Sequence, residues 1–491
     1  MDEELPSVIV AESMVLFRST NLTCDEFFSD FLPPYKYISS TIVLWISFML
    51  YVSLKKNTNY GIVSIRKSID GLKNIEKTYI TTLDVFRVVA IIWVIINHTG
   101  SEGRLDILQG LPSAEIFKSS IHNHPIFGAL LGNSGLGVDI FLVLSGFLAS
   151  ISWSYQENKS FLPHYILFIA KRWVRIFPSL IIFIAIASSP FMQRILPRFY
   201  NSIVSSCGFT GTISHLIFLA NWRSTPICFG YLWYLSLDMQ FYIIAPLLFH
   251  LAYKSRISAI LLSFALIVFS MAFRAFHCVL YNVCDQSDVD IPFISYEATD
   301  NSTTGRYTGL WEIYSRPFPK CGPFLIGFLA AQAFRQMHIK LSISKIYTSL
   351  TISSFAIFAS IYGILPQYWH PKSGSTLYNV LYTAIFQTLF ALALATMIFI
   401  FSNIHKRKKS NRLWMILARL TFSVYLVHMP IVFIFNYLKI LQDATSPYIL
   451  IAVVPFVALI SFIVGFLFHI IFESPLTRLG MVTVQRLSAA L

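Results

Sequence analysis

The chain has 491 residues, of which 55% are hydrophobic and only 12% are charged, about half the charged share of a typical globular protein. This composition excludes a chain that covers a large water-facing surface and predicts an all-α, polytopic integral membrane protein with lipid as its main solvent. The net charge of +13 comes from short Lys and Arg clusters between apolar runs, a pattern typical of cytoplasmic loops. We identify no nucleic-acid-binding motif and expect no nucleic-acid partner.

Apolar runs recur along the whole chain, and we predict eleven spans, most of them able to cross about 30 Å of hydrocarbon as α-helix. The predicted organisation is a lumenal or extracellular N-terminus at 1–36, an anchor span at 37–54, a cytoplasmic linker at 55–78, a ten-span unit at 79–476 and a tail at 477–491. The ten spans are expected near 82–99, 136–154, 177–192, 233–252, 257–274, 321–337, 346–364, 376–402, 413–436 and 448–472. The run at 177–192 has the weakest apolar signal, and we place Pro178 and Pro190 at its ends, where proline is tolerated.

The distribution of positive charge predicts the orientation. One side of the map carries 22 Lys and Arg and the other 13, while Arg87 and Arg419 lie inside spans. The positive-inside rule makes the richer side cytoplasmic, so the N-terminus is expected outside or in the lumen and the C-terminus inside. Both the endoplasmic reticulum and the plasma membrane fit this arrangement.

Cysteines and glycosylation sequons agree with that orientation. All six cysteines fall in or beside predicted lumenal segments, which favours disulfides in an oxidising compartment, and Cys278 and Cys284 share a loop and are the one pair that we predict. Sequons at Asn21 and Asn301 are also lumenal on this map and are predicted glycosylation sites, whereas the sequon at Asn158 is cytoplasmic.

The segment RVVAIIWVIINH places Arg87 and His98 at the two ends of one predicted span, with Asp84 just before it. Steps of 11 and 14 residues return to nearly the same helix face, so the three side chains form one polar stripe. Asp84 and Arg87 can pair at i,i+3, and His98 lies about 16 Å further along the axis. Ionisable groups in a span usually face the bundle interior. The alternative is that Arg87 and His98 only reach the two headgroup zones.

Three basic residues, Lys171, Arg172 and Arg175, lie at a predicted cytoplasmic helix mouth. Three cations within five residues suit phosphate groups, although an ordinary positive-inside flank is an equal alternative. Glu473 ends the last span at the same side, where pairing with a loop cation is the plain alternative.

Other polar side chains lie within apolar spans or at their lumenal ends. The segment GVDIFLVLSGFLAS carries Asp139 at its entrance and Ser145 midway, and its glycines, Gly146 among them, allow close helix approach. Asp238 lies between two tyrosines at i−4 and i+4, which could satisfy it as a structural Asp. Arg316 lies at the beginning of a predicted span that runs from the lumen to the cytosol.

Tyr425 and His428 share one face of a later span at i,i+3, and a His in that position needs a partner or a function. The sequence contains no HExxH or CxxC motif, so we expect no metal site and no permanently bound cofactor.

Taken in order, the motifs resemble a known family. The ordered set is LD at 83–84, the Arg-x10-His pair, GVDIFLVLSGFL, KRWVRIFP, LWYLSLDMQFY, RPFPKCGPFLIG, SVYLVHMPIV and FESP. It resembles the membrane acyltransferase-3 family over about residues 79–476, and within it the nose-resistant-to-fluoxetine-like animal branch. Two departures stand out: only 36 residues precede the first predicted span, where that branch commonly has a large lumenal domain, and KRWVR replaces the two adjacent arginines of many members.

The resemblance implies a ten-span core that moves an acyl group from cytosolic acyl-CoA to a hydroxyl of a lipid or small-molecule acceptor. It implies Arg87 and His98 as the essential pair, with His98 as base or as covalent acyl carrier. Residues near the donor's phosphates would be Lys171, Arg172 and Arg175. The other site or supporting residues are Asp84, Asp139, Ser145, Asp238, Arg316, Tyr425, His428 and Glu473.

Two other classes of function remain open. A carrier for lipophilic small molecules is one, although carriers often show two similar half-molecules and we find no internal repeat. A non-catalytic regulator is the other, and the intact Arg-x10-His pair favours an enzyme over it.

Overall fold

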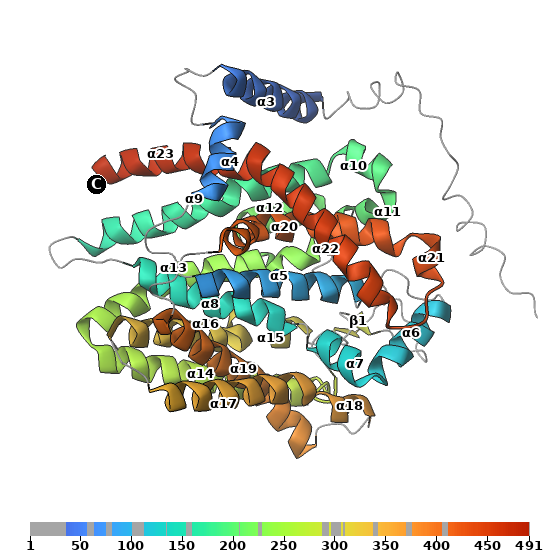
Figure 1. Cartoon of the computed structure of the whole chain (residues 1–491), viewed down its shortest axis with the longest axis vertical. Coiled ribbons are helices and arrows are strands. Elements are labelled where there is room, and N and C mark those ends of the chain that lie inside the picture. The colour runs from blue at the N-terminus through green and yellow to red at the C-terminus, as the bar shows by residue number, and fades with distance from the viewer. Residues whose placement is uncertain are drawn as a thin grey trace, which may run out of the picture.

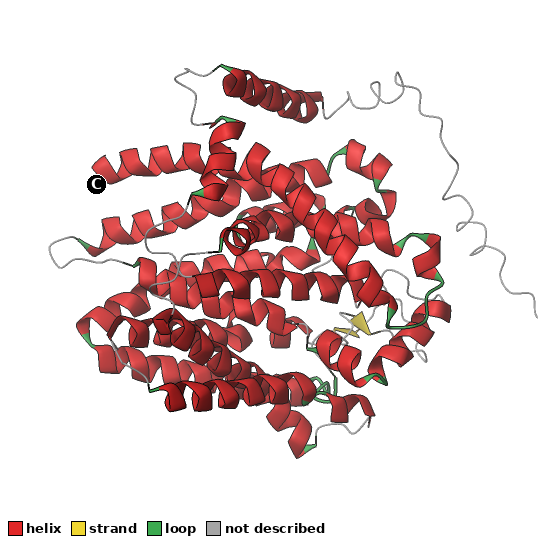
Figure 2. Ribbon diagram, in the orientation of Figure 1, coloured by secondary structure: helices red, strands yellow, loops and turns green. Residues whose placement is uncertain are grey.

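The computed structural model describes residues 36–55, 63–74, 81–100, 112–133, 135–153, 160–205, 207–223, 228–286, 294–295, 306–307, 310–336, 342–369, 376–404 and 411–490. This part of the chain is a helical bundle with one short antiparallel pair, β1 (Ile294–Ser295) and β2 (Arg306–Tyr307) (Figures 1 and 2). The predicted all-α membrane fold is therefore confirmed. The predicted glycosylation sites Asn21 and Asn301 lie outside the described residues.

Eight helices of the described part are long and apolar enough to cross a membrane, and they match eight predicted spans. They are α5 (Thr81–Gly100), α8 (Gly135–Ser152), α13 (Trp233–Lys254), α14 (Arg256–Leu280), α17 (Ile343–Tyr362), α19 (Leu377–Ile404), α20 (Arg412–Asn436) and α22 (Ile449–Phe468). Their apolar side chains face either lipid or one another, and α14 and α17 bury the smallest share of their surface in the bundle. The protein is thus an integral membrane protein.

Three other predicted spans form helices that do not reach the combination of length and hydropathy that those eight share: α3 (Lys36–Leu54), α9 (Phe161–Ala187) and α16 (Pro317–Gln336). The predicted bounds 177–192 are wrong, because α9 begins at Phe161, passes through Pro178 and ends before Pro190, which starts α10 (Pro190–Ile195). Proline removes one backbone hydrogen bond, but burial of Ser179 and Leu180 against the bundle keeps the helix continuous.

Shorter elements connect these helices. They are α4 (Ile65–Lys73), α6 (Pro112–His122), α7 (Pro125–Gly132), α11 (Pro197–Phe199), η4 (Tyr200–Val204), α12 (Gly208–Leu216), η5 (Ala220–Trp222), η6 (Gly230–Leu232), α15 (Leu310–Tyr314), α18 (Leu365–Trp369), α21 (Lys439–Gln442), η8 (His469–Glu473) and α23 (Ser474–Ala490).

Helix α5 lies in the middle of the bundle, where it packs against α8, α20 and α22 (Figure 1). Helices α14, α16, α17 and α19 form one flank, and α9, α20, α22 and α23 form the other. Helix α3 lies outside, beside α4, and Trp45 Nε1 ties it to the carbonyl of Ile471 in η8 at 2.9 Å. The position of α5 puts every side chain of its polar stripe close to another helix.

The closest helix contact joins α8 to α16. A Cβ added to Gly146 would lie 2.0 Å from the carbonyl oxygen of Phe324, and one added to Gly327 would lie 2.1 Å from that of Val143. Both positions therefore require glycine, and the predicted close approach at Gly146 is confirmed. This contact fixes the register of two helices that carry buried charges.

Two ends of the bundle differ in chemistry. We call the end where α5 begins the basic end, defined by Arg87, Arg175 and Arg419. The opposite end holds two disulfides, Cys207–Cys228 and Cys278–Cys284, and we call it the disulfide end. The predicted pair is confirmed, the Cys207–Cys228 pair was not predicted, Cys321 is a free thiol, and Cys24 lies outside the described residues.

Candidate active site

His98 lies in the last turn of α5 and is inside the bundle, with 7% of its surface exposed. The fully buried ring of His428, from α20, lies with its centroid 5.0 Å from that of His98. Tyr231, from η6, presents its ring nearly edge-on to both, with centroids 5.5 Å from His428 and 6.4 Å from His98. Three separate elements thus bring two imidazoles and a phenol together, and the ring of His98 is packed among them inside the bundle.

Hydrogen bonding fixes the tautomer of His428. Its Nδ1 lies 2.8 Å from the carbonyl oxygen of Tyr425, and a carbonyl only accepts, so Nδ1 carries the proton. The other ring nitrogen, Nε2, then holds a lone pair. It is buried and has no hydrogen-bond partner among the described residues. A buried basic nitrogen left in this state beside a second imidazole is suited to accept a proton.

Arg87 lies at the other end of the same helix. Its Nη1 donates to Asp84 Oδ1 at 2.9 Å, which confirms the predicted i,i+3 pair. Eleven residues separate Arg87 from His98, or about 16 Å along the axis, so the two share a helix without sharing a contact. The direct neighbour of His98 is instead His428.

The basic end gathers cations from three helices. Arg175 of α9 lies within electrostatic range of Arg172, Arg87 and Glu473, and Asp84 lies within range of both Arg87 and Arg419. Lys171 and Arg175 are exposed, whereas Arg172 is only half-buried and already engaged. Like charges held close together are costly, so this cluster favours an anionic ligand.

The guanidinium of Arg172 forms an ion pair with Asp238. Its Nε donates to Asp238 Oδ2 at 3.1 Å, its Nη2 contacts the same oxygen, and its guanidinium lies 4.3 Å from the ring centre of Tyr242. Ser145 donates to the other carboxylate oxygen at 2.5 Å. Asp238 is therefore satisfied by an arginine and a serine rather than by the two neighbouring tyrosines. Lys171 and Arg175 remain the accessible cations of the three predicted for donor binding.

The family profile for the acyltransferase domain matches residues 80–470, which is most of the chain. The chain belongs to the acyltransferase-3 family. It is similar to the protein named Regulator of hypoxia-inducible factor 1 from Caenorhabditis elegans, with 45% identity over 460 residues that cover 90% of each chain. It is also similar to Nose resistant to fluoxetine protein 6 of the same organism, with 26% identity over 436 residues, 82% of this chain and 51% of that protein. No solved structure matches the chain.

Within this acyltransferase-3 chain, Glu473 forms a buried group with Ser423 and His469. Ser423 donates to Glu473 Oε2 at 2.5 Å, and His469 Nδ1 lies 2.9 Å from the same oxygen. A serine nucleophile needs a histidine as its direct neighbour, with the carboxylate behind it. Here the carboxylate stands between the two, so the group holds charge near Arg175 and does not activate Ser423.

Asp139 and Lys320 form an ion pair of 2.9 Å between α8 and α16, and both side chains are fully buried. The Lys320 ammonium also lies 4.8 Å from the ring centre of Tyr314. A pair that is fully enclosed in this way fixes the relation of two helices and is not open to a substrate.

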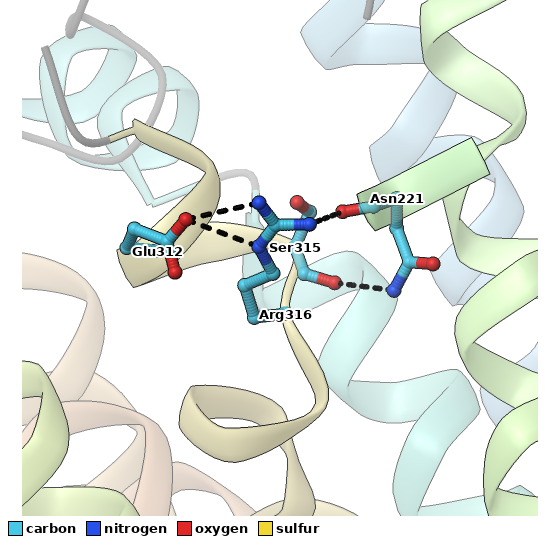
Figure 3. A network of polar contacts seen from close by, with 4 residues as sticks. All are labelled: Asn221, Glu312, Ser315 and Arg316. Carbon is cyan, nitrogen blue, oxygen red and sulfur yellow. Dashed lines mark hydrogen bonds and ion pairs between the residues drawn. The ribbon is translucent and has the colours of Figure 1, made fainter. Parts of the chain in front are cut away.

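Arg316 braces the disulfide end. Its Nε and Nη2 donate to Glu312 Oε1 at 3.1 and 3.0 Å, and its Nη1 donates to the carbonyl of Asn221 at 2.5 Å (Figure 3). Asn221 in turn donates to the carbonyl of Ser315 at 3.0 Å. This network joins η5 to α15 and the start of α16, so the guanidinium of Arg316 holds these segments together.

Sequence reasoning missed Tyr231, Lys320, Ser423 and His469. Tyr231 directly precedes the LWYLSLDMQFY motif, but no spacing rule connects it with α5. Lys320 offered a signal, because a lysine at the start of an apolar run needs a counter-charge. Among the described residues, no group of three or more His, Cys, Asp or Glu side chains is arranged to hold a metal ion.

Proposed function

We propose that this protein is a membrane-embedded O-acyltransferase that moves an acyl group from acyl-CoA to a hydroxyl of a lipid or small-molecule acceptor. The observation that carries the proposal is the unpartnered, buried Nε2 of His428 beside the buried ring of His98, in a chain of the acyltransferase-3 family. Acyl transfer to an alcohol needs a base whose pKa is near neutrality, and imidazole is the side chain that supplies one.

The reaction follows from this pair. His98 removes the proton of the acceptor hydroxyl while the hydroxyl oxygen attacks the carbonyl carbon of the thioester. The tetrahedral intermediate that results expels the CoA thiolate. The thiolate then takes up the proton from His98. His428 accepts a hydrogen bond at Nε2 from the imidazolium or from the acceptor and so keeps the proton inside the pair. In the alternative version, His98 carries the acyl group on nitrogen between two transfers.

The donor is expected at the basic end, which the Lys and Arg distribution predicts to be cytoplasmic. Exposed Lys171 and Arg175 are suited to the phosphates of CoA, and Arg87 lies between them and the imidazoles along α5. The acceptor would then approach from the disulfide end. The gathering of both disulfides at that end supports its lumenal or extracellular assignment, and glycosylation of Asn21 and Asn301 is the matching expectation.

The test is transfer of labelled acyl groups from acyl-CoA in membranes that contain wild type or His98→Ala. Wild-type membranes are expected to form an acylated product that the variant loses by about 10²- to 10⁴-fold, the range of general-base catalysis. His277→Ala is the matched control, because His277 stacks on Phe273 of α14 away from the pair and its loss should leave transfer intact. Equal product from wild type and His98→Ala at equal protein levels would contradict the proposal.

A non-catalytic regulator that handles lipophilic small molecules is the second candidate, favoured by the name of the relative that is 45% identical over 90% of the chain. It predicts no acylated product from wild-type membranes, together with ligand binding that survives His98→Ala. A carrier predicts uptake that survives the same change and no binding of acyl-CoA by the purified protein.

A further inference from the structure

The turn at residues 228–232, which leads into α13, is held at its beginning by three separate bonds. Cys228 is joined to Cys207 by a disulfide, and its carbonyl oxygen lies 2.7 Å from Nε2 of His215. The next amide, Phe229 N, donates to the carbonyl of Ile203 in η4 at 3.1 Å. Burial lowers the pKa of His215 to about 4, so the ring is neutral and donates to Cys228 from Nε2.

The backbone needs this restraint. Phe229 is fully buried and has a φ of +44°, in the left-handed region that side chains other than glycine rarely adopt. Such a conformation persists only when its surroundings hold it in place. The disulfide and the two hydrogen bonds are the contacts that do so here, and they set the direction in which the chain enters η6.

Two reciprocal hydrogen bonds connect the turn to α20. The hydroxyl of Tyr231 donates to the carbonyl of Leu426 at 3.1 Å, and the hydroxyl of Tyr425 donates to the carbonyl of Tyr231. The carbonyl of Tyr425 is the group that accepts the proton of His428 Nδ1. These two hydrogen bonds therefore hold in place the helical turn that sets the tautomer and orientation of His428, and the Tyr231 ring lies against that imidazole.

We propose that Tyr231 is a positioning residue for His428 and that the Cys207–Cys228 disulfide keeps it in place, so that acyl transfer depends on the oxidised form of this cysteine pair. This inference rests on the proposed function and adds a form of regulation to it. Opening the disulfide releases the turn, the hydroxyl of Tyr231 leaves the carbonyl of Leu426, and the imidazole pair loses its fixed geometry.

The chain offers its own control. Cys278–Cys284 closes the end of α14 and packs with Val283 and Ile313 in a small cluster, separate from the large core that contains Cys207, Cys228 and Tyr231. Removing this second disulfide therefore tests the general effect of losing a cross-link at the same end of the protein.

The experiment compares four full-length proteins in bilayer nanodiscs: wild type, Tyr231→Phe, Cys207→Ser/Cys228→Ser and Cys278→Ser/Cys284→Ser. The first readout is kcat and KM for acyl-CoA. We expect Tyr231→Phe, which keeps the ring and removes only the hydroxyl, to lower kcat about tenfold with an unchanged KM. The Cys207/Cys228 double variant should show at least as large a loss, and the Cys278/Cys284 variant should match wild type.

The second readout does not need activity. Diethyl pyrocarbonate transfers its ethoxycarbonyl group to an imidazole nitrogen with release of ethanol and carbon dioxide, and mass spectrometry of the peptide reports the extent at His428. We expect several-fold faster modification in Tyr231→Phe and in the Cys207/Cys228 variant than in wild type and the control, because His428 is fully enclosed in the intact structure.

A dithiol completes the test. It gives two electrons and two protons to the disulfide, which becomes two thiols while the dithiol closes to its own disulfide. Wild type and the Cys278/Cys284 variant should then lose kcat, and the Cys207/Cys228 variant should not respond. Unchanged kcat and unchanged His428 modification in Tyr231→Phe and after reduction would overturn the inference. A wild type without transfer activity would overturn the proposed function, and the modification rates would still decide the positioning role.

Discussion

Among the polar side chains inside the described part of the bundle, the buried ion pairs and the imidazole pair differ in how they are matched. Between α8, α13, α16 and α9, each buried carboxylate meets a cation: Asp139 meets Lys320, and Asp238 meets Arg172. Between α5, α20 and η6, two imidazoles meet each other, and one ring nitrogen has no partner among the described residues. Paired opposite charges hold the helices in register. The unpartnered Nε2 of His428, in contrast, lowers the stability of the folded protein and is free to take part in proton transfer.

The sharpest way to test this difference is His428→Ala. The change removes the unmatched nitrogen, so transfer should fall by about 10²- to 10⁴-fold. Nε2 itself makes no hydrogen bond, so the loss of stability should come only from the lost ring packing and the lost Nδ1 bond to Tyr425, and the protein should stay folded. Activity assays and thermal unfolding on the same preparation check both parts. Loss of folding together with loss of activity would place His428 in the structural group instead.

Lys320→Met tests the opposite side of the comparison. It leaves the fully buried Asp139 without its cation, and breaking a buried pair in this way costs about 3–5 kcal/mol. The double variant Lys320→Met/Asp139→Leu removes both charges and should recover most of that loss. Thermal unfolding of the two variants beside wild type measures the effect, and equal stabilities for the single and double variants would show that the pair does not hold α8 to α16.

Gly146→Ala should have the smallest effect, and it tests the glycine contact between the same two helices, α8 and α16. The added methyl group would lie 2.0 Å from a backbone oxygen of α16, so the helices must separate, with a loss of about 1–3 kcal/mol. Gly71→Ala is the matched control, because a Cβ at Gly71 in α4 meets nothing within 4 Å. If both changes left thermal unfolding as in wild type, the close approach of α8 and α16 would not limit stability.

From the sequence alone, we could predict the part of the candidate site that depends only on the geometry of single helices. The 3.6-residue period is a local property, so Asp84, Arg87 and His98 could be assigned to one stripe and the Asp84–Arg87 pair could be named. The same reasoning placed Tyr425 and His428 on one face. It could not show that these two stripes meet, because that depends on which helices are neighbours.

Apolar run length, charge distribution and motif order were thus enough to determine the membrane class, eight of the spans, one disulfide and the family, because each depends on residues close together in the chain. Only the tertiary structure decided that His98 meets His428 rather than Arg87, that Arg172 is taken by Asp238, and that α9 continues through Pro178. The physical reason is the same in each case. Packing between distant segments selects the partner of a buried polar group and compensates for a local break, and no single segment contains that information.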